Sequence, residues 1–553
     1  MSLKLSYKNK IPAQTVRIAK SAFPKGNPYI TLRDHLGTIF EDIDFMKMFP
    51  KVGQPALQPW RLALLTVIQH GENLSDRQTA EAVRARIDLK YLLGLNIDDS
   101  GFDYSVLSEF RKRLVEHKME ELLLSKILDV AKSLKIIKTR GHQRTDSTRV
   151  LMSVKELNRY EVIGETMRST LNHIAVIEPV WLKSIVPYEW YDRYHFRFEN
   201  YRLPTKLEDK NLLMQVIGKD AHTLIKLIEQ DDTPYTIKTS SKVGSLRTML
   251  ARHFHSNNET YEVIYKTNKE AHQSEAQIES PYDIEARYRT KRQDNWSGYT
   301  VHLTETCDNG FANIITNVCT TTADVHDSMT VNIIHDSLKN KHLLPEKHLV
   351  DSAYMSAVHL YSSKLEFDVE LVGPVRSSRK PKNFLEGSYT VEDFDIQWAN
   401  KKIICPNGKE SSSWRQTNTG NSPEHIDVVF RAADCKKCLN QKFCTQTKSG
   451  RKKFNLLEEK FYTVNLEARN KMKTDEQYKK TYRKRSGIEG TISNAVNMHS
   501  LRKSRYVGLQ KTHLQEISNA AAININRIAN WLSGKTVEKT RISKFYQLKL
   551  KAA

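Results

Sequence analysis

Three acidic residues in different local patterns most constrain the fold of this chain. Asp146 lies within the short β-compatible segment 142–151, and Asp351 ends the apolar strand-like run 349–351. Glu489 lies in a strongly basic stretch with helical character. Carboxylates supply the hard oxygen ligands that magnesium prefers, and basic surroundings suit a polyanionic substrate. The joint pattern predicts a fold that gathers two strands and a helix around a metal-dependent phosphoryl-transfer site on nucleic acid.

The segments between these acids follow the order of an α/β fold. Strand patterns occur at 296–307, 312–321, 349–351 and 369–373, and a helical pattern occurs at 326–339. The first two of these strands alternate clearly enough to predict an antiparallel pair. Together with the last helix, this order matches a ribonuclease-H-like fold that is interrupted twice. In such a fold, Asp146 lies on the first central strand, Asp351 ends the adjacent fourth strand, and Glu489 projects from the last helix toward both.

The first 140 residues have the periodicity of a helical domain. The dense apolar run Trp60–Ile68 predicts a buried helix, and Ser75 and Gln78 form a capping box for the next helix. Further helices are expected at 104–114 and 120–137. Their basic side chains suit a duplex-binding module, and a bundle that only packs or dimerises is the alternative. The candidate DNA contacts on these helices are Arg77, Arg84, Arg111, Lys112 and Arg113.

Changes of pattern divide the chain into six parts. The chain has 553 residues, which is too long for one compact core. The expected parts are a helical N-terminal DNA-binding domain (1–140), the first pieces of the core (141–151 and 281–377), a helical insertion (152–280), a β-rich insertion (378–470), the final core helices (471–535) and a basic C-terminal tail (536–553).

The charge balance favours a polyanionic partner. Lys and Arg number 86 against 64 acidic residues, which gives a net charge of +22. A solubilising surface would give the same surplus and is the alternative. No apolar run approaches the roughly 18 residues of a membrane-spanning helix, and the N-terminus lacks the apolar segment of a signal peptide. We therefore expect a cytoplasmic protein without a membrane partner.

Four of the six cysteines fall within a 40-residue window. In a reducing cytosol, cysteines serve as thiols or metal ligands more often than as disulfides. Cys405, Cys435, Cys438 and Cys444 include a Cys-x-x-Cys pair, which suits a structural zinc site with four thiolates. An unmetallated subdomain with reduced cysteines is the alternative. Cys307 and Cys319 alternate with apolar strand residues and are expected in the core.

The motifs around the three acids resemble those of bacterial insertion-sequence transposases of the DDE type. In one group of this family the third acid lies in a Tyr-x-x-Arg-x-x-x-Glu signature, and Tyr482, Arg485 and Glu489 have that spacing. The block 145–150 resembles the segment around the family's first acid, and 350–354 resembles that around the second. The N-terminal helical region also resembles the domain that these transposases carry ahead of the catalytic core.

This resemblance implies a DNA transposase that binds the terminal inverted repeats of its own element. Asp146, Asp351 and Glu489 would hold two Mg²⁺ or Mn²⁺ ions for cleavage and strand transfer. The implied partners are double-stranded DNA, as element ends and as target, and a second copy of the chain in a homodimer on DNA. The implied location is the bacterial nucleoid.

The resemblance also implies DNA-binding residues near the last helix. In the family a lysine often follows the glutamate by seven residues, whereas Val496 stands there in this chain. Arg502, Lys503 and Arg505 are the candidates to supply that cation. The full set of expected DNA contacts in this region is Tyr482, Arg485, Arg502, Arg505 and Lys511. A packed aromatic ring and a solvated charge are the alternative roles for Tyr482 and Arg485.

Two other functions are compatible with the same residues. One is a repurposed DNA-binding protein that no longer transposes, and three intact acids argue against it. The other is a ribonuclease-H-like nuclease that cuts without strand transfer. The helical N-terminal region and the length of the chain favour the transposase.

Overall fold

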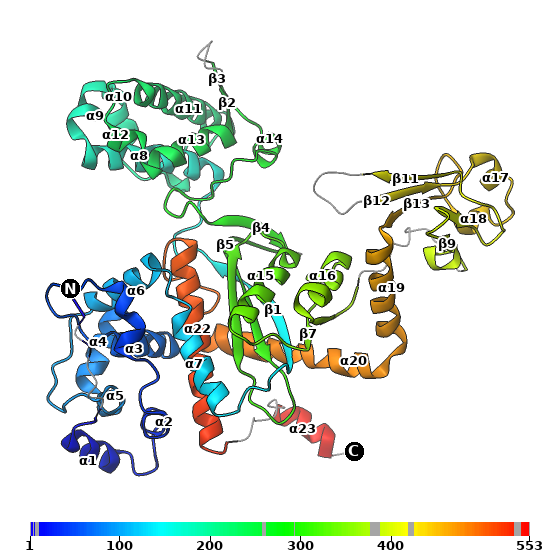
Figure 1. Ribbon diagram of the computed structural model, residues 1–553. Coiled ribbons are helices and arrows are strands. Elements are labelled where there is room, and N and C mark those ends of the chain that lie inside the picture. Colours follow the sequence, from blue (N-terminus) through cyan, green and yellow to red (C-terminus); the bar gives the residue numbers. More distant parts are fainter. Residues whose placement is uncertain are drawn as a thin grey trace.

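A mixed six-stranded sheet lies at the centre of the protein (Figure 1). The computed structural model describes residues 2–3, 5, 10–256, 262–291, 293–375, 387–417, 425–535 and 543–551. The helices of the N-terminal region pack on one side of the sheet, a helical insertion lies beyond one end, and a small β-rich part lies at the far end of two helices. The chain is therefore a mixed α/β protein, as the order of sequence patterns predicts.

The sheet combines antiparallel and parallel strands around β1. The strands are β1 (His142–Leu151), β4 (Arg287–Lys291), β5 (Asp294–Thr306), β6 (Ile315–Thr322), β7 (Lys347–Leu349) and β8 (Glu370–Val372). β5 pairs antiparallel with β1 on one side and with β4 and β6 on the other. β7 pairs parallel with β1, and β8 pairs parallel with β7. The predicted antiparallel pair and the predicted adjacency of the first strand and the strand before Asp351 are both confirmed.

Two helices that connect the parallel strands pack beside the sheet. After β6 the chain forms the short 3₁₀ helix η3 (Asp327–Thr330) and then α15 (Val331–Asn340), and α16 (Ala357–Phe367) joins β7 to β8. Neighbouring parallel strands run in the same direction, so the chain must return to the starting edge between them. A tight turn cannot span that distance, and a helix usually makes the connection. The predicted helix at 326–339 is confirmed by η3 and α15 together.

Among the described residues of the N-terminal region, every helix or strand element is a helix. Its elements are α1 (Ala13–Ala22), α2 (Pro28–Leu36), η1 (Asp42–Met48), α3 (Pro59–Gly71), α4 (Asp76–Ala85), α5 (Ile87–Leu93), α6 (Ser105–Glu116) and α7 (Leu122–Ser133). α3 is buried along nearly its whole length because its apolar residues surround the helix rather than line one face. The predicted capping box at the start of α4 is present, with Ser75 accepting from Gln78 N–H.

The helix α22 (Leu509–Leu532) joins the N-terminal helices to the sheet. It packs against α3 and α7 on one side and against β6 on the other. Asn524 donates to and accepts from the backbone of Ile315, each at 2.8 Å, and so extends the hydrogen bonding of β6 into the helix. One continuous apolar core contains residues of the N-terminal helices, the sheet and α22. The N-terminal region is thus built into the main core.

The insertion between β1 and β4 is mainly helical and has its own core. Its elements are α8 (Arg159–Ile177), α9 (Pro179–Ile185), α10 (Tyr188–Arg193), η2 (Asn200–Arg202), α11 (Leu207–Glu229), α12 (Tyr235–Lys238), α13 (Ser241–His253), the hairpin of β2 (Phe254–Ser256) and β3 (Val263–Tyr265), and α14 (Asn268–His272). The long helices α8, α11 and α13 pack against one another, which gives this part a core separate from that of the sheet.

A second insertion after β8 is rich in short strands, as predicted. It contains η4 (Val391–Asp393), β9 (Asp395–Gln397), β10 (Lys402–Ile404), β11 (Ser413–Thr417), β12 (His425–Val429), α17 (Ala432–Lys436), α18 (Gln441–Cys444) and β13 (Lys453–Leu457). α19 (Glu459–Thr474) and α20 (Glu476–Arg483) then return the chain to the sheet, where η5 (Lys484–Ser486) and α21 (Gly487–His499) follow (Figure 1).

Part of the C-terminal tail is helical. α23 (Lys544–Lys551) forms part of the predicted basic tail, and residues 536–542 and 552–553 lie outside the described residues. Within the described part of the chain, no helix is long and apolar enough to cross a membrane.

A buried carboxylate on β5 links the sheet to both C-terminal core helices. Glu305 is fully buried and forms ion pairs with Arg144 at 2.6 Å and with Arg527 at 2.8 Å. It also accepts a hydrogen bond from Thr491 at 2.8 Å. These partners lie on β1, α22 and α21, so one side chain fixes three elements against β5. A buried carboxylate with this many partners orders its surroundings.

Glu516 on α22 predicts a pH-dependent stability. The side chain is fully buried, and burial raises its pKa to about 8. Between the ordinary glutamate pKa and pH 8 the folded chain therefore holds a proton that the unfolded chain releases, so folding becomes less favourable as pH rises. We expect Glu516→Gln to gain about 3 kcal/mol relative to wild type when the pH rises from 5.5 to 7.5, measured by urea denaturation.

The control for this prediction is Glu189→Gln, which changes an exposed glutamate of α10. Its stability should follow the wild-type pH profile. Parallel profiles for Glu516→Gln and wild type would show that Glu516 is ionised in the folded chain.

Candidate active site

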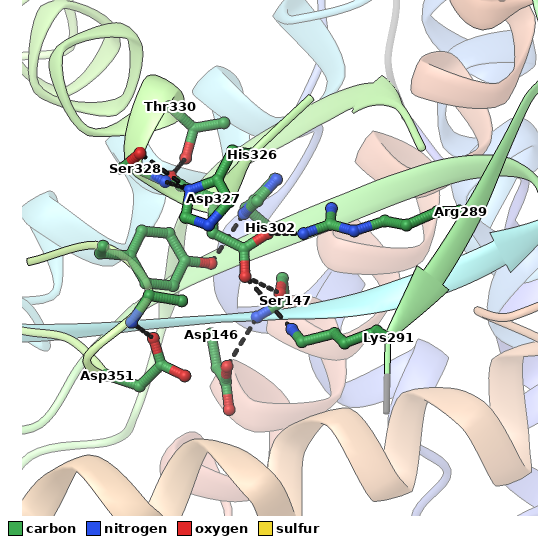
Figure 2. A network of polar contacts seen from close by, with 12 residues as sticks. Asp146, Ser147, Arg289, Lys291, His302, His326, Asp327, Ser328, Thr330 and Asp351 are labelled. Carbon is green, nitrogen blue, oxygen red and sulfur yellow. Dashed lines mark hydrogen bonds and ion pairs between the residues drawn. The ribbon is translucent and has the colours of Figure 1, made fainter. Parts of the chain in front are cut away.

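The register of the sheet brings two of the three predicted acids together. In the parallel ladder, His142 of β1 lies beside Lys347 of β7, a separation of 205 positions. Asp146 and Asp351 are separated by the same number of positions, so continuing the ladder places them side by side. Parallel neighbours lie roughly 5 Å apart and point to the same face of the sheet. Figure 2 shows the two carboxylates next to each other at the end of β7.

The alternation of β1 selects which residues face the last core helices. Successive side chains of a strand point to opposite faces, so Arg144, Asp146 and Thr148 share one face. All three contact the region that follows α20. Arg144 donates to the carbonyl of Lys484 at 2.6 Å. Asp146 accepts from the guanidinium of Arg485 at 2.5 Å. The hydroxyl of Thr148 accepts from Nε of Arg502 at 2.9 Å. Strand β1 thereby positions the segment that carries the third acid.

Glu489 enters the site from the first turn of α21. The start of this helix packs closely on β1, because a Cβ at Gly487 would lie 2.1 Å from Nη1 of Arg144. The carboxylate of Glu489 is 63% exposed, and its Oε1 lies 3.2 Å from Nη1 of Arg485. The three predicted acids therefore come from β1, from just beyond β7 and from α21.

Arg485 forms a bridge between two of the acids. Its Nη2 pairs with Asp146, and its Nη1 pairs with Glu489. The side chain is only 15% exposed, and its buried Nε finds no acceptor among the described residues. A guanidinium has five N–H donors, so the two acids do not use the full hydrogen-bonding capacity of this arginine.

The acids line one open, cationic cleft of about 780 Å³. The basic residues of this cleft are Arg149, Arg289, Lys291, Arg485 and Arg502. Burial raises the pKa of Asp146, the charge of Arg485 opposes that rise, and the charge of Asp351 adds to it. A desolvated carboxylate beside a second carboxylate gains most from a cation, and the basic walls suit a polyanion.

The donor chemistry of this cleft fits a divalent cation of the magnesium type. Asp146 and Asp351 each use Oδ1 to accept a backbone N–H, from Ser147 at 2.9 Å and from Ala353 at 2.8 Å. These bonds fix both rotamers. The second oxygen of Asp146 accepts from Arg485. Among the described residues, no three His, Cys, Asp or Glu side chains converge closely enough to hold an ion. An ion that took the paired oxygens of Asp146 and Glu489 would have to displace Arg485.

Tyr482 is partly buried in a small apolar cluster next to the sheet. Tyr482 packs beside Tyr478, Leu349 and Val372 under the end of α20, and burial raises the pKa of its hydroxyl. η5 interrupts the helix between Tyr482 and Glu489, so the two residues do not share one helical face.

Arg502, one of the candidates for the cation absent at Val496, lies in the loop after α21. Val496 itself packs against the main core. The backbone of Arg502 bonds to Leu151 N–H at 2.9 Å, and this pairing with the end of β1 carries the guanidinium into the cleft.

The other predicted DNA contacts divide into exposed and inward-facing side chains. Arg77, Arg84 and Lys112 are exposed on α4 and α6, and Lys511 is exposed in the first turn of α22. The inward-facing residues are Arg111, which pairs with Asp76, Arg113, which pairs with Glu109, and Arg505, which bonds to Leu74 and Asn73. Arg111 is buried, so its charge serves the packing of the helices in this structure.

Asp327 at the start of η3 is a site residue that the sequence reasoning missed. It is fully buried behind Asp146 and pairs with Arg289 at 3.3 Å and Lys291 at 3.2 Å (Figure 2). It also accepts from Ser147, the neighbour of Asp146, at 3.3 Å. Burial opposes ionisation, but Lys291, His302 and Arg289 hold the pKa of Asp327 below its usual value. The sequence offered one indication of this role: Asp327 is an acidic residue in the first turn of the helix that follows a strand.

The cysteines divide as the sequence predicts. Cys307 and Cys319 are buried, and burial raises the pKa of each thiol to about 12. The remaining four, Cys405, Cys435, Cys438 and Cys444, are half-buried and line a separate cavity in the β-rich insertion.

Two protein families match parts of this chain. Residues 404–529 match a family described as "Transposase DDE domain", and residues 17–113 match one described as "Transposase domain (DUF772)". The first match contains Glu489, Arg485, Arg502 and the four clustered cysteines. The second covers the helices from α1 to most of α6. No curated protein matches the chain. The DDE family implies the use of a divalent metal, which agrees with the oxygen donors of the cleft.

The bridge made by Arg485 predicts a competition between the arginine and the metal. Without its charge, Asp146 and Glu489 lose their present cation and become better ligands. We expect Arg485→Gln to bind Mn²⁺ at least tenfold more tightly than wild type without DNA, measured by titration calorimetry.

A control variant, Arg149→Gln, removes a cleft cation that pairs with Asp294 rather than with the three acids. Its Mn²⁺ affinity should stay close to that of wild type. Unchanged Mn²⁺ affinity in Arg485→Gln would refute the competition.

Proposed function

We propose that this chain, an insertion-sequence transposase of the DDE type, cuts DNA at the ends of its own element and joins those ends to a target. The observation that carries this proposal is the convergence of Asp146, Asp351 and Glu489 on one cationic cleft. They come from three separate parts of the sequence. Surface carboxylates without a shared role rarely meet in this way, and their oxygens suit Mg²⁺ or Mn²⁺.

The sheet supports a ribonuclease-H-like catalytic core. β6, β5, β1, β7 and β8 lie in this order, with antiparallel pairing up to β1 and parallel pairing beyond it. Two insertions interrupt the core, one after β1 and one after β8. Both leave the pairing of the central strands intact, so the acids keep their relative positions despite long intervening segments.

The residues of the cleft divide the work of phosphodiester cleavage and transfer. Two divalent ions held by Asp146, Asp351 and Glu489 would supply the charge that activates water or a 3′-hydroxyl and stabilises the leaving oxygen. Arg502 and Lys291 line the cleft and would hold the phosphate backbone there. The side chain of Arg485 would leave the acids and donate to a phosphate oxygen. Asp327 holds Lys291 and Arg289 in position and so keeps the cationic wall beside Asp146.

The N-terminal helices are proposed to recognise the inverted repeats. Arg77, Arg84 and Lys112 present exposed charges there, and Lys511 adds a charge at the start of α22. Because these helices share the main core, they hold a fixed orientation toward the cleft. Bound end DNA can then run from the recognition helices to the acids, and two chains in a homodimer would hold the two ends of the element.

The proposed catalytic acids are tested by neutral substitutions. Asp146→Asn, Asp351→Asn and Glu489→Gln should each reduce cleavage of a labelled element end at least a thousandfold with Mg²⁺, since an amide is a poor ligand for this ion. DNA affinity should change less than threefold. Asp294→Asn is the matched control, because Asp294 lines the same cleft but pairs with Arg149.

The same assay separates transposition from simple cleavage. Joined products are expected with wild type and with Asp294→Asn. Near-normal joining by any of the three acid variants would remove that residue from the metal shell. Cleavage without joined products would identify a nuclease instead.

The recognition role is tested by the salt dependence of binding in the full-length chain. Each lost phosphate contact should reduce the slope of log affinity against log salt concentration by about one unit. We expect this for Arg77→Ala and Lys112→Ala, together with a smaller preference for end DNA over random duplex.

Lys364→Ala on α16 is the control, because this lysine pairs with Asp368 away from the N-terminal helices. Its slope should equal that of wild type. An unchanged preference for end DNA in both N-terminal variants would assign recognition to another part of the chain.

A further inference from the structure

The β-rich insertion gathers four cysteines from three separate segments around one cavity. Cys405 follows β10, Cys435 lies in α17, Cys438 follows that helix, and Cys444 ends α18. All four line a cavity of about 490 Å³. Each is half-buried, so each thiol can reach the cavity and still change rotamer.

Two of the sulfurs already accept hydrogen bonds. The backbone N–H of Lys409 points to Sγ of Cys405 at 3.3 Å, within a turn that Gly408 closes with a φ of +74°. The side chain of Asn407 donates to Sγ of Cys438 at 3.0 Å. This second bond connects the turn to the segment after α17. N–H donors that face sulfur hold it in place as a metal ligand.

The surrounding positive charge suits a metal site with anionic ligands. Between residues 431 and 453 the sequence has eight basic residues and one acidic residue, Asp434. The basic residues are Arg431, Lys436, Lys437, Lys442, Lys448, Arg451, Lys452 and Lys453. Nζ of Lys452 lies 2.6 Å from the carbonyl of Cys444. Four thiolates around a divalent ion carry a net charge of −2, so a basic rim compensates a site of this composition.

The apolar core of this insertion is small. Its buried members are Phe394, Ile403, Ile426, Val428, Phe430, Phe454 and Leu456. A core of this size supplies only a few kcal/mol, about 3–5, so a metal crosslink would add a substantial share of the stability. Cys405, Cys435 and Cys444 pack at the edge of this core, where a crosslink would join β10 to α17 and α18.

We propose that Cys405, Cys435, Cys438 and Cys444 bind one zinc ion that fixes this insertion. The donor set is the four-thiolate shell of structural zinc sites. In the described structure the thiols surround the cavity but do not converge on one point, so binding involves rotation of their side chains. The ion would hold the insertion together and take no part in DNA cleavage. The proposal is therefore independent of the function of the cleft between β1 and α21.

Metal analysis of the full-length protein tests the site. Purified wild type should contain about one zinc per chain, and Cys435→Ser and Cys438→Ser should each contain less than a fifth of that amount. Cys319→Ser is the matched control, because this buried cysteine lies in the main core. Exchange with Co²⁺ should produce the absorption of a tetrahedral cobalt–thiolate site in wild type and in the control.

Thiol labelling keeps the proposal testable even where a variant fails to fold. In wild type, four cysteines should resist alkylation until a chelator is added and then react, whereas Cys307 and Cys319 stay protected in the folded core. Unaltered labelling in the presence of chelator, or absence of zinc and of the cobalt absorption after reconstitution, would overturn the site. Disulfide-linked peptides joining these cysteines in the non-reduced protein would assign the crosslink to oxidation instead.

Discussion

The buried ion pairs of Glu305 hold the catalytic half of the protein in one arrangement. Glu305 lies opposite Arg144 in the antiparallel register of β1 and β5, and it also binds Arg527 of α22 and Thr491 of α21. Loss of one partner of such a buried pair costs about 3–5 kcal/mol, because the remaining charge stays desolvated. Arg144 additionally binds the carbonyl of Lys484, just ahead of the helix of Glu489. The position of the third acid thus depends on a contact made within the sheet.

Sequence reasoning could find the acids because their surroundings are local. A strand of alternating residues, an apolar run and a basic helix are each visible within ten to twenty positions. Adjacency of Asp146 and Asp351 followed from strand order, and the register of β1 and β7 supports it. The capping box at Ser75, the buried helix α3 and the buried Cys307 and Cys319 were also predictable, because each depends on nearby residues or on simple alternation.

The missed features depend on contacts between distant segments. Asp327 serves the site only because β4 brings Arg289 and Lys291 beside it, and neither the pairing of β4 nor its register is visible in the sequence. Arg111 was expected on the surface, whereas Asp76 and Gln69 draw it into the helical core. A basic residue in a helix has the same local pattern in both situations. The interruption at η5 likewise follows from how α20 and α21 pack, and it separates Tyr482 from the face of Glu489.

Under the proposed function, charge balance at the site would link metal binding to the binding of DNA. Asp146 and Glu489 share one arginine, whose single charge offsets one of their two negative charges before any ligand enters. A divalent ion and Arg485 compete for the same oxygens, and two cations cannot occupy them together at low energy. DNA offers the arginine an alternative anion, because its buried Nε still needs an acceptor. If a phosphate binds Arg485, the acids become free for metal, and by linkage bound metal favours DNA to the same extent. Under the proposed function, the active site would assemble only when metal and DNA are both present, which would restrict cutting to the complex with DNA.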